Sequence, residues 1–327
     1  MSLSSRRRRI TALAALAVIG LFASACGNGD GGGDTVRTAN GHTYDLSPEQ
    51  PGRIHAAKVD SIAAQVPAAI RDRGTLIVTG AAQSSPPLRS YATDDRTVVG
   101  SEVDFANLFA DILGLKVDLR TADWAQNSVK VDSGEVDAFI SNVTVTEERK
   151  EKFDFATYRL DNLAFEVPKD ANWTFTGDRK VLAGKRIGVS AGTNQEQLLV
   201  KWDQDNVAEG LPKVDIVYFQ QVTDYYLGLS SGRLDAYLGP NPSAQYHSAT
   251  AGQTKVVGNI SGAGDALQAE IGVLTKKDNG LIGAVQQAIQ YAIDHGTYQQ
   301  VIERWGLNDE TVAQSRINPP GLPKRKG

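Results

Sequence analysis

An internal repeat constrains the fold of this chain more than any other feature of its sequence. The segment SGEVDAFISN at residues 133–142 recurs as SGRLDAYLGPN at residues 231–241. Each copy predicts a helix that ends at Ser-Gly, a turn, and a strand whose carboxyl end carries small polar residues. We therefore expect two similar lobes, and a duplicated structural unit without a ligand is the alternative interpretation.

Apolar runs and helical periods alternate along the chain from Thr75 onward. This alternation predicts an α/β fold with largely parallel sheets. Ligands of such sheets bind beyond the carboxyl ends of the strands, so two facing lobes would enclose a cleft for a small molecule. The predicted strands cover residues 76–79, 115–119, 136–140, 164–167, 186–189 and 214–218, and the predicted helices cover residues 61–72, 103–113, 281–292 and 298–305.

The first 25 residues have the pattern of an export signal. Arg6 to Arg9 precede an apolar run at residues 10–22, and small residues lead to Cys26. A helix of this length spans about 20 Å at about 1.5 Å per residue, too little for a bilayer core of about 30 Å. The segment before Cys26 resembles the lipobox of bacterial lipoproteins, which implies that Cys26 is acylated. Ala23 departs from the usual leucine, and an ordinary cleavage site near an incidental cysteine is the alternative.

The charge and the cysteine count exclude several classes of function. The chain has 34 Lys and Arg against 38 Asp and Glu, so no basic excess indicates binding to nucleic acid. Cleavage before Cys26 removes four positive charges, which takes the formal net charge from −4 to −8. Cys26 is the only cysteine, so disulfides and cysteine catalysis are not expected. The four histidines form no metal-binding motif, and we expect no metal or cofactor.

A tether and a polar extension are expected after the signal, at residues 26–60. Residues 27–34 formally contain G-x-G-x-x-G, but the run follows no predicted strand and opens no helix. It is therefore interpreted as a flexible tether and not as a phosphate-binding turn. Residues 35–60 are polar with weak periodicity, so we expect them to pack loosely and expect folded structure to begin near Ser61.

Several short motifs occur in an order and at spacings that are specific when taken together. They include Val99-Gly100, Glu102-Val103-Asp104, TVTEER at residues 144–149, AGT at residues 191–193 and DHGTY at residues 294–298. On these residues the chain resembles the family 3 solute-binding proteins of bacterial ABC transporters, most of which bind polar amino acids. The resemblance covers nearly all of residues 76–307.

The resemblance implies an α/β, two-lobed fold of the type II periplasmic-binding-protein class, with hinge strands and an interlobe cleft. With hinges near residues 167–169 and 270–273, lobe 1 would comprise residues 61–167 and 271–315, lobe 2 residues 168–270, and a tail residues 316–327. The implied function is capture of an amino acid or related small carboxylate outside the cytoplasm and its delivery to an ABC permease. The implied protein is a monomer held on the membrane by a lipid anchor at Cys26.

The resemblance assigns ligand contacts to Asn142, Thr144, Arg149 and Thr193, with Trp124 covering the ligand. Arg149 would hold the ligand carboxylate, because a planar guanidinium donates two parallel hydrogen bonds and stays charged. By itself, an arginine in TEERKEK is typical of a solvated helical charge. Thr144 and Thr193 each have a glutamate three residues later, which also predicts capping boxes at helix starts. For Trp124, ordinary packing within the lobe is the alternative.

Two departures from the family pattern bear on the ligand. Ser85 stands before Pro86-Pro87 where the family usually has an aromatic residue, and Pro240-Asn241 stands where an aspartate usually pairs with the ligand ammonium. Burying an ammonium without a partner costs several kcal/mol. Either Asn241 and neighbouring carbonyls replace the aspartate, or the ligand lacks that cation. A carboxylate on the ligand is therefore the firmer prediction.

Two enzymatic interpretations and a sensor are the alternatives to transport. GVSAG at residues 188–192 has the G-x-S-x-G form of a hydrolase nucleophile turn, and Asp235 and His295 follow Ser190 in triad order. The same run falls on the family's glycine-threonine turn, which favours a binding protein. A dehydratase on the same fold would need a buried general base, for which Glu270 and Asp224 are the candidates. A sensor would use the same clamp to report its ligand.

Overall fold

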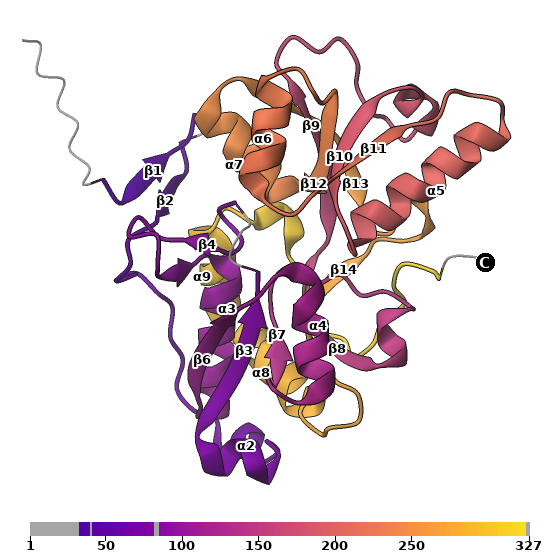
Figure 1. Ribbon diagram of the computed structural model, residues 1–327. Coiled ribbons are helices and arrows are strands. Elements are labelled where there is room, and N and C mark those ends of the chain that lie inside the picture. The colour runs from indigo at the N-terminus through magenta and orange to yellow at the C-terminus, as the bar shows by residue number, and fades with distance from the viewer. Residues whose placement is uncertain (1–32, 40, 82–84, 325–327) are drawn as a thin grey trace, which may run out of the picture. The chain divides into compact units, whose positions relative to one another are not determined.

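The computed structural model describes residues 33–39, 41–81 and 85–324. Cys26 and the predicted signal lie outside these residues. The described residues form one compact unit, which holds two five-stranded sheets (Figure 1). Within the described ranges, no helix has the length and apolar character needed to cross a membrane.

Each sheet belongs to one lobe, and the strands of the two sheets are arranged alike. The first-lobe sheet contains β3 (Thr75–Gly80), β6 (Lys116–Thr121), β7 (Ala138–Phe139), β8 (Phe153–Leu160) and β14 (Glu270–Lys276) in the order β6-β3-β7-β14-β8. The second-lobe sheet contains β9 (Asn162–Pro168), β10 (Arg186–Ser190), β11 (Asp215–Phe219), β12 (Ala236–Pro240) and β13 (Thr254–Ser261) in the order β11-β10-β12-β9-β13. Three neighbouring strands of each sheet are parallel, and the fourth runs antiparallel to both its neighbours. The expected parallel arrangement is thus confined to three strands per lobe.

The two copies of the sequence repeat occupy equivalent places in the two sheets. β7 and β12 are the middle strands, and the aspartate directly before each one accepts a backbone hydrogen bond from the adjacent strand. Asp137 accepts a hydrogen bond from the Ile77 amide at 2.7 Å, and Asp235 accepts one from the Arg186 amide at 2.7 Å. The repeated sequence therefore builds the same strand junction twice.

The chain passes between the sheets at two places. Asp161 separates β8 from β9, and residues 262–269 separate β13 from β14. The first crossing lies earlier than the hinge expected at residues 167–169, because β9 pairs with β12 and β13 along its length. The second crossing ends at the hinge expected near residue 270.

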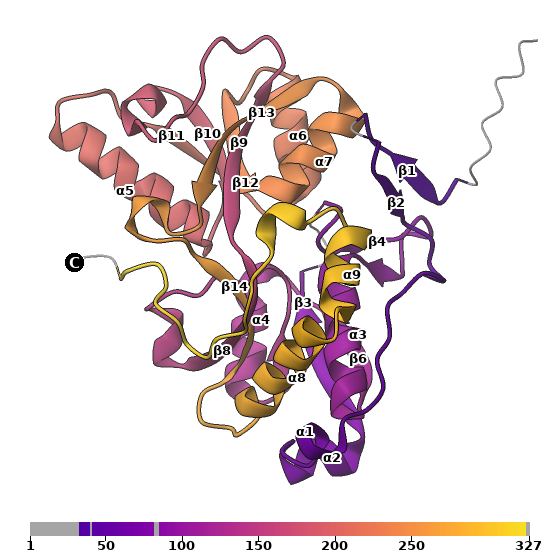
Figure 2. The same cartoon turned by 180° about the vertical axis from the view of Figure 1, so that it is seen from behind.

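Helices cover both faces of each sheet (Figures 1 and 2). In the first lobe, α3 (Ser101–Leu113), α8 (Ile282–Asp294) and α9 (Thr297–Arg304) share one apolar core with the sheet, and α4 (Trp124–Ser133) packs in a separate cluster. In the second lobe, α5 (Asn194–Ala208) lies on the opposite side of the sheet from α6 (Val222–Ser230) and α7 (Asn241–Ala251). Gly114 ends α3 in the left-handed conformation (φ 69°), as expected.

The N-terminal extension is packed, so the expectation of a loose segment is wrong. β1 (Thr35–Arg37) and β2 (Thr43–Asp45) form a hairpin that buries Tyr44. Arg53 pairs with the fully buried carboxylate of Asp104 at 2.9 Å. Two short helices, α1 (Asp60–Ala63) and α2 (Ala68–Arg73), replace the single helix expected at residues 61–72, because Pro67 lacks the amide needed to continue the first helix.

The C-terminal segment also contacts both lobes. Leu322 pairs with Thr146 of the first lobe and belongs to the apolar cluster of the second lobe. The Gln197 side chain of α5 donates a hydrogen bond to the Pro323 carbonyl at 3.1 Å. The remaining short elements are β4 (Ser90–Tyr91), β5 (Val98–Val99) and the 3₁₀ helices η1 (Arg149–Glu151), η2 (Arg179–Leu182), η3 (Gly264–Ala266) and η4 (Asn308–Glu310).

Candidate functional site

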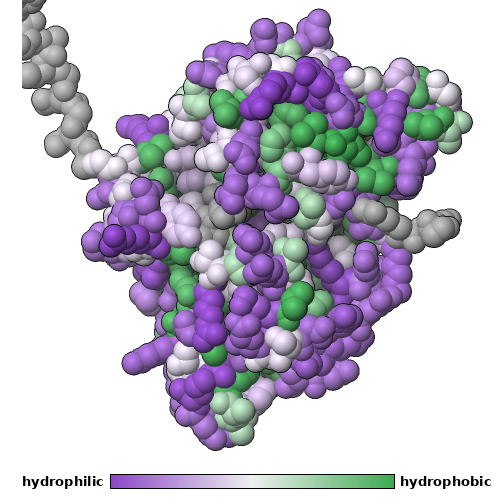
Figure 3. All heavy atoms as spheres, in the orientation of Figure 1, coloured by the Kyte–Doolittle hydropathy of each residue, from purple (hydrophilic) through white to green (hydrophobic). Residues whose placement is uncertain are grey.

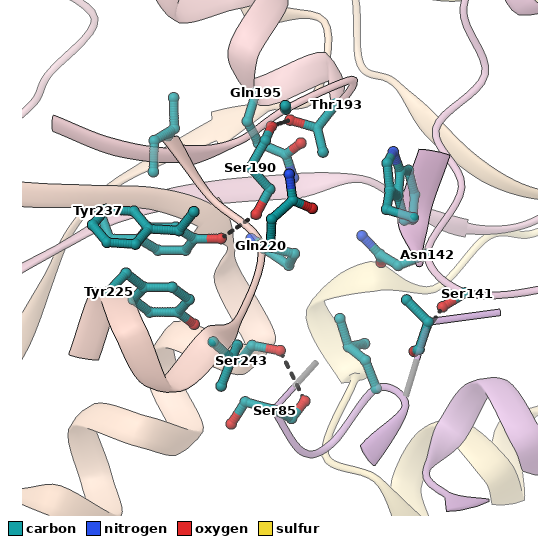
Figure 4. Close-up of a pocket in the computed structure, with 18 of the residues that line it drawn as sticks. Ser85, Ser141, Asn142, Ser190, Thr193, Gln195, Gln220, Tyr225, Tyr237 and Ser243 are labelled. Atoms are coloured by element: carbon teal, nitrogen blue, oxygen red, sulfur yellow. Dashed lines mark hydrogen bonds between the residues drawn. The ribbon is translucent and has the colours of Figure 1, made fainter. Parts of the chain in front are cut away.

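A pocket of about 100 Å³ lies between the two lobes, and we call it the inner pocket. Figure 4 shows Tyr225 and Tyr237 of the second lobe on one side of it and Ser141 and Asn142 of the first lobe on the other. Its full lining is Ala81, Ser85, Leu88, Trp124, Ser141 and Asn142 from the first lobe, and Ser190, Ala191, Thr193, Asn194, Gln195, Phe219, Gln220, Val222, Tyr225, Tyr237, Leu238, Pro240 and Ser243 from the second. The pocket thus lies where the sequence repeat predicts a cleft.

A second cavity of about 630 Å³, the outer pocket, also has walls from both lobes. Thr193 and Asn194 line both pockets, so the two are neighbours. The charged residues of the outer pocket are Glu148, Arg149, Glu151, Lys152, Glu196 and Lys324. Figure 3 shows that hydrophilic residues predominate where the two lobes meet on this face, while apolar residues gather over the upper lobe beside β11.

The structure brings most of the predicted site residues to these two pockets. Ser85, Trp124, Asn142 and Thr193 line the inner pocket, and Arg149 lines the outer one together with Thr193. Two predicted residues line neither pocket. Thr144 is buried behind the wall, and Asn241 begins α7, where its side chain accepts a hydrogen bond from Gln245 at 3.4 Å.

Arg149 connects the lobes through its guanidinium. Nη1 donates to the Thr144 carbonyl at 2.9 Å, and Nη2 donates to the Gly192 carbonyl of the second lobe at 3.2 Å. The Trp124 indole donates to the same Gly192 carbonyl at 3.1 Å, and the guanidinium carbon lies 5.7 Å from the centre of its ring. Burial lowers the pKa of Arg149 to about 10, so it remains a cation at neutral pH. Arg149 is therefore half-buried and bridging, not a solvated helical charge.

Asp161, at the crossing between the sheets, lies behind Arg149 and was not indicated by any motif. Its carboxylate accepts hydrogen bonds from Thr144 Oγ1 at 2.7 Å and from Asn194 Nδ2 at 2.9 Å. Only 1% of Asp161 is exposed, and this burial raises its pKa. Because Thr144 belongs to the first lobe and Asn194 to the second, Asp161 fixes both lobes at the base of the cleft.

The two predicted capping boxes have different outcomes. Thr193 caps α5, since its Oγ1 accepts the Glu196 amide at 3.2 Å, although the Glu196 carboxylate accepts from the Gly192 amide and not from Thr193. The prediction that Thr144 caps a helix is wrong. Its backbone pairs with Ile271 and its hydroxyl donates to Asp161, so no helix begins there.

Asn142 is held in a left-handed conformation (φ 57°) by a buried charge network. Its amide N–H donates to Glu102 Oε2 at 2.7 Å, and its Oδ1 accepts from Arg159 at 2.6 Å. Arg159 also pairs with Glu102 and with Glu310, and each of these three side chains is almost fully buried. Because a guanidinium can only donate, Oδ1 must face Arg159, and the amide nitrogen of Asn142 then faces the inner pocket (Figure 4).

The second-lobe wall of the inner pocket is aromatic and uncharged, and sequence motifs did not identify it. Tyr225 and Tyr237 stack with ring centres 3.4 Å apart, and the Tyr237 hydroxyl lies 3.3 Å from Ser190 Oγ. Burial raises the pKa of Tyr237 to about 12, so its phenol stays neutral. The periodic spacing of Tyr225 and Leu229 in α6 was the available signal, but it indicates only a buried helix face.

The structure does not assemble the groups of the enzymatic alternatives. Asp235 binds the Arg186 amide, and His295 binds the Tyr291 carbonyl in α8, so neither contacts Ser190. Of the two candidate bases, Glu270 pairs with Arg316 and Asp224 lies exposed on α6, and neither lines either pocket. Across the described part of the chain, no group of three or more His, Cys, Asp and Glu side chains could hold a metal ion.

Comparison with known proteins agrees with this geometry. Residues 77–308 match the bacterial extracellular solute-binding proteins, family 3. The L-cystine-binding protein TcyJ of Escherichia coli K12 is 34% identical over 246 residues, which cover 74% of this chain and 86% of the relative. The arginine-binding protein ArgT of Corynebacterium glutamicum is 28% identical over 278 residues, or 84% of this chain and 88% of ArgT.

A solved structure repeats the two-lobed arrangement. An ancestral arginine-binding protein bound to arginine superimposes with a TM-score of 0.63 at 29% identity, and the match covers 71% of this chain and 98% of that one. Residues 77–308, which match the family, include nearly all of both sheets and nearly all residues of the two pockets. This chain therefore belongs to family 3 of the bacterial extracellular solute-binding proteins.

Proposed function

We propose that this chain is the solute receptor of an ABC importer and that it binds an amino acid, or a related small carboxylate, between its lobes. The observation that carries the proposal is the environment of the Arg149 guanidinium. Its guanidinium is half-buried at the interlobe crevice, and among the described residues no carboxylate lies within ion-pair distance of it. Two backbone carbonyls satisfy part of its donor capacity, and a ligand carboxylate is a stronger acceptor than either.

The elements around Arg149 support binding of an anion. α5 begins one residue after Thr193, and its free backbone amides attract negative charge. A carboxylate placed between Arg149 and the start of α5 would contact both lobes. Since ligand favours the closed clamp only through contacts that the closed form adds, such a bridging position couples binding to closure.

The relatives support an amino acid as the ligand. TcyJ is a cystine-binding protein, ArgT is an arginine-binding protein, and the superimposed ancestral protein is bound to arginine. All three ligands carry the α-carboxylate that Arg149 would bind. The inner pocket adjoins that position through Thr193 and Asn194, so it would receive the side chain of the solute.

Calorimetry on the purified protein tests the proposal. We expect at least one of L-cystine, L-glutamine, L-citrulline and L-arginine to bind with a Kd near 1 μM, about −8 kcal/mol. Arg149→Ala should abolish this binding while circular dichroism stays unchanged. Arg71→Ala, which removes an exposed arginine at the end of α2, is the matched control and should bind normally. Unchanged affinity in Arg149→Ala refutes the assigned role.

We further propose that the mature protein acts as a monomer on the outer face of the cytoplasmic membrane, anchored by a lipid at Cys26. The arginines and the apolar run before Cys26 support export, and the relatives are extracellular solute-binding proteins. Cells labelled with a palmitate analogue should yield a labelled protein in the membrane fraction. Cys26→Ser should be unlabelled and released, and labelling of that variant would contradict the assignment.

We also propose that the protein hands its solute unchanged to the permease and has no enzymatic activity. The separation of Ser190, Asp235 and His295 supports this, because Ser190 then has no general base. A serine-directed fluorophosphonate should leave the protein unmodified, and mass spectrometry should recover each bound solute intact. Stoichiometric modification of Ser190, or steady conversion of a solute, would contradict a purely binding role.

A further inference from the structure

The lining of the inner pocket carries no full charge. The described residues that form it include no Asp, Glu, Lys, Arg or His, although hydroxyls, side-chain amides and aromatic rings are frequent. A solute group inside the pocket would therefore meet dipoles and rings, with no counter-ion.

Three buried carboxylates, Glu102, Asp161 and Glu166, lie behind the pocket walls next to lining residues. Glu102 is held by Arg159 and the Asn142 amide, and Asp161 by Thr144 and Asn194. Glu166 pairs in register with Tyr237 in the neighbouring strand and is fully buried. Its Oε1 is bound to His247 and Thr254, while its Oε2 has no hydrogen-bond partner in the described structure. None of the three carboxylates lines the pocket, so a cationic solute side chain inside it would be buried without a carboxylate in contact with it.

Two side-chain amides define the polarity of the pocket instead. Asn142 must present its N–H₂ group, because Arg159 holds its oxygen. Gln195, in the first turn of α5, lines the pocket with only 7% of its surface exposed, and its Oε1 has no hydrogen-bond partner in the described structure. A buried, unsatisfied amide is costly unless another group satisfies it, so Gln195 is suited to a solute group that both donates and accepts.

We infer that the inner pocket selects a solute whose side chain is uncharged and ends in a neutral hydrogen-bonding group, such as a carboxamide or urea, and that Gln195 makes this selection. The inference rests on the proposed function, because it places the α-carboxylate at Arg149 and the side chain beside Gln195. It sets this chain apart from its arginine-binding relatives. Arginine would bring a guanidinium with no carboxylate to receive it, and glutamate would bring a carboxylate with no second cation.

Pairs of amino acids that differ in side-chain charge test the preference for a neutral side chain directly. L-citrulline and L-arginine have the same length and differ in a urea against a guanidinium, and L-glutamine and L-glutamate differ in an amide against a carboxylate. We expect calorimetry on the purified protein to give the neutral member of each pair a Kd lower by about tenfold or more. Tighter binding of arginine than of citrulline would overturn the inference and leave the proposed function intact. Binding of none of the four, nor of cystine, would overturn both.

A charge substitution at Gln195 tests whether this residue selects neutral side chains. Gln195→Glu places an anion in the pocket, and we expect the citrulline-to-arginine preference to fall by at least about tenfold and to reverse. A glutamate in the first turn of α5 also suits the helix dipole, so the fold should be retained. Gln204→Glu makes the same charge change at an exposed position of α5 and should leave both affinities unchanged. An unaltered preference in Gln195→Glu would overturn the role of Gln195.

A second variant separates specificity from folding. Gln195→Met keeps the length of the side chain and removes its hydrogen-bonding group. We expect citrulline and glutamine to bind it about tenfold more weakly, while the melting temperature stays close to that of the natural protein. Unchanged affinity for both neutral amino acids in the folded Met variant would also overturn the assignment.

Discussion

Stability of this protein should depend on pH through Glu310, which lies in η4 next to Arg159. Arg159 is flanked by two buried carboxylates, Glu102 and Glu310, so the cluster carries one excess negative charge when both are ionised. Desolvation raises the pKa of Glu310 from 4.5 to about 8. Protonation of Glu310 near neutral pH is therefore expected to remove the excess charge.

The sign and size of the effect follow from linkage between protonation and folding. The unfolded chain ionises Glu310 above about pH 4.5, whereas the folded protein keeps its proton up to about pH 8. Folding is therefore favoured at low pH by this group, and the contribution is lost as pH rises towards 8. The shift therefore predicts that the unfolding free energy falls by about 3 kcal/mol between pH 6 and pH 9.

Urea unfolding at pH 6 and pH 9 measures this change. Glu310→Gln cannot ionise and retains a hydrogen-bond acceptor for Arg159, so its unfolding free energy should lose most of that pH dependence. Glu303→Gln, at an exposed position of α9, is the control and should keep the full dependence. If the natural protein and Glu310→Gln respond equally to pH, the assumed excess charge at Arg159 is wrong.

Three further changes test the interlobe contacts and one tight turn. Trp124→Phe removes the hydrogen bond to the Gly192 carbonyl and should make the closed form less favourable by about 1 kcal/mol, seen as a larger radius of gyration in X-ray scattering without solute; no change in scattering would contradict this. Tyr44→Ala removes the edge-on contact with Tyr246 of α7, 5.1 Å away, and should lower the melting temperature by a few degrees, whereas an equal melting temperature would show that the contact contributes nothing. Gly100→Ala should cost more than about 3 kcal/mol in urea unfolding, because its Cβ would lie 1.9 Å from the Leu88 carbonyl at φ 121°, and a smaller loss would mean that the loop can shift.

The parts of the fold that sequence predicts are those decided locally. The two lobes follow from the repeat, because Asp137 and Asp235 each act on the strand beside them. The end of α3 follows from Gly114, which the chain needs for a left-handed residue. In contrast, the crossing at Asp161 depends on which sheet receives β9, and an apolar run at residues 164–167 is equally compatible with either sheet.

Contacts between distant segments explain what sequence reasoning missed. Thr144 has the sequence pattern of a helix cap. In the structure its hydroxyl instead donates a hydrogen bond to Asp161, which lies between the two sheets. The strands around Tyr44 have three residues each, too few to show a period, and their burial depends on α7 and α9. Motifs located Ser85, Trp124, Asn142 and Thr193 of the inner pocket. Gln195 became significant only when its burial beside an uncharged lining was known.

The bridge at Gly192 connects solute binding to lobe movement. Its carbonyl accepts hydrogen bonds from Arg149 and from Trp124, and these two first-lobe donors both face the crevice. A solute carboxylate at the proposed position on Arg149 Nη2 would compete with this carbonyl. Exchange of the Arg149 hydrogen bond would then lower the affinity for the solute by about 1 kcal/mol. The same contacts join the two lobes, so we expect a solute that replaces them with stronger charge-assisted bonds to keep the lobes together.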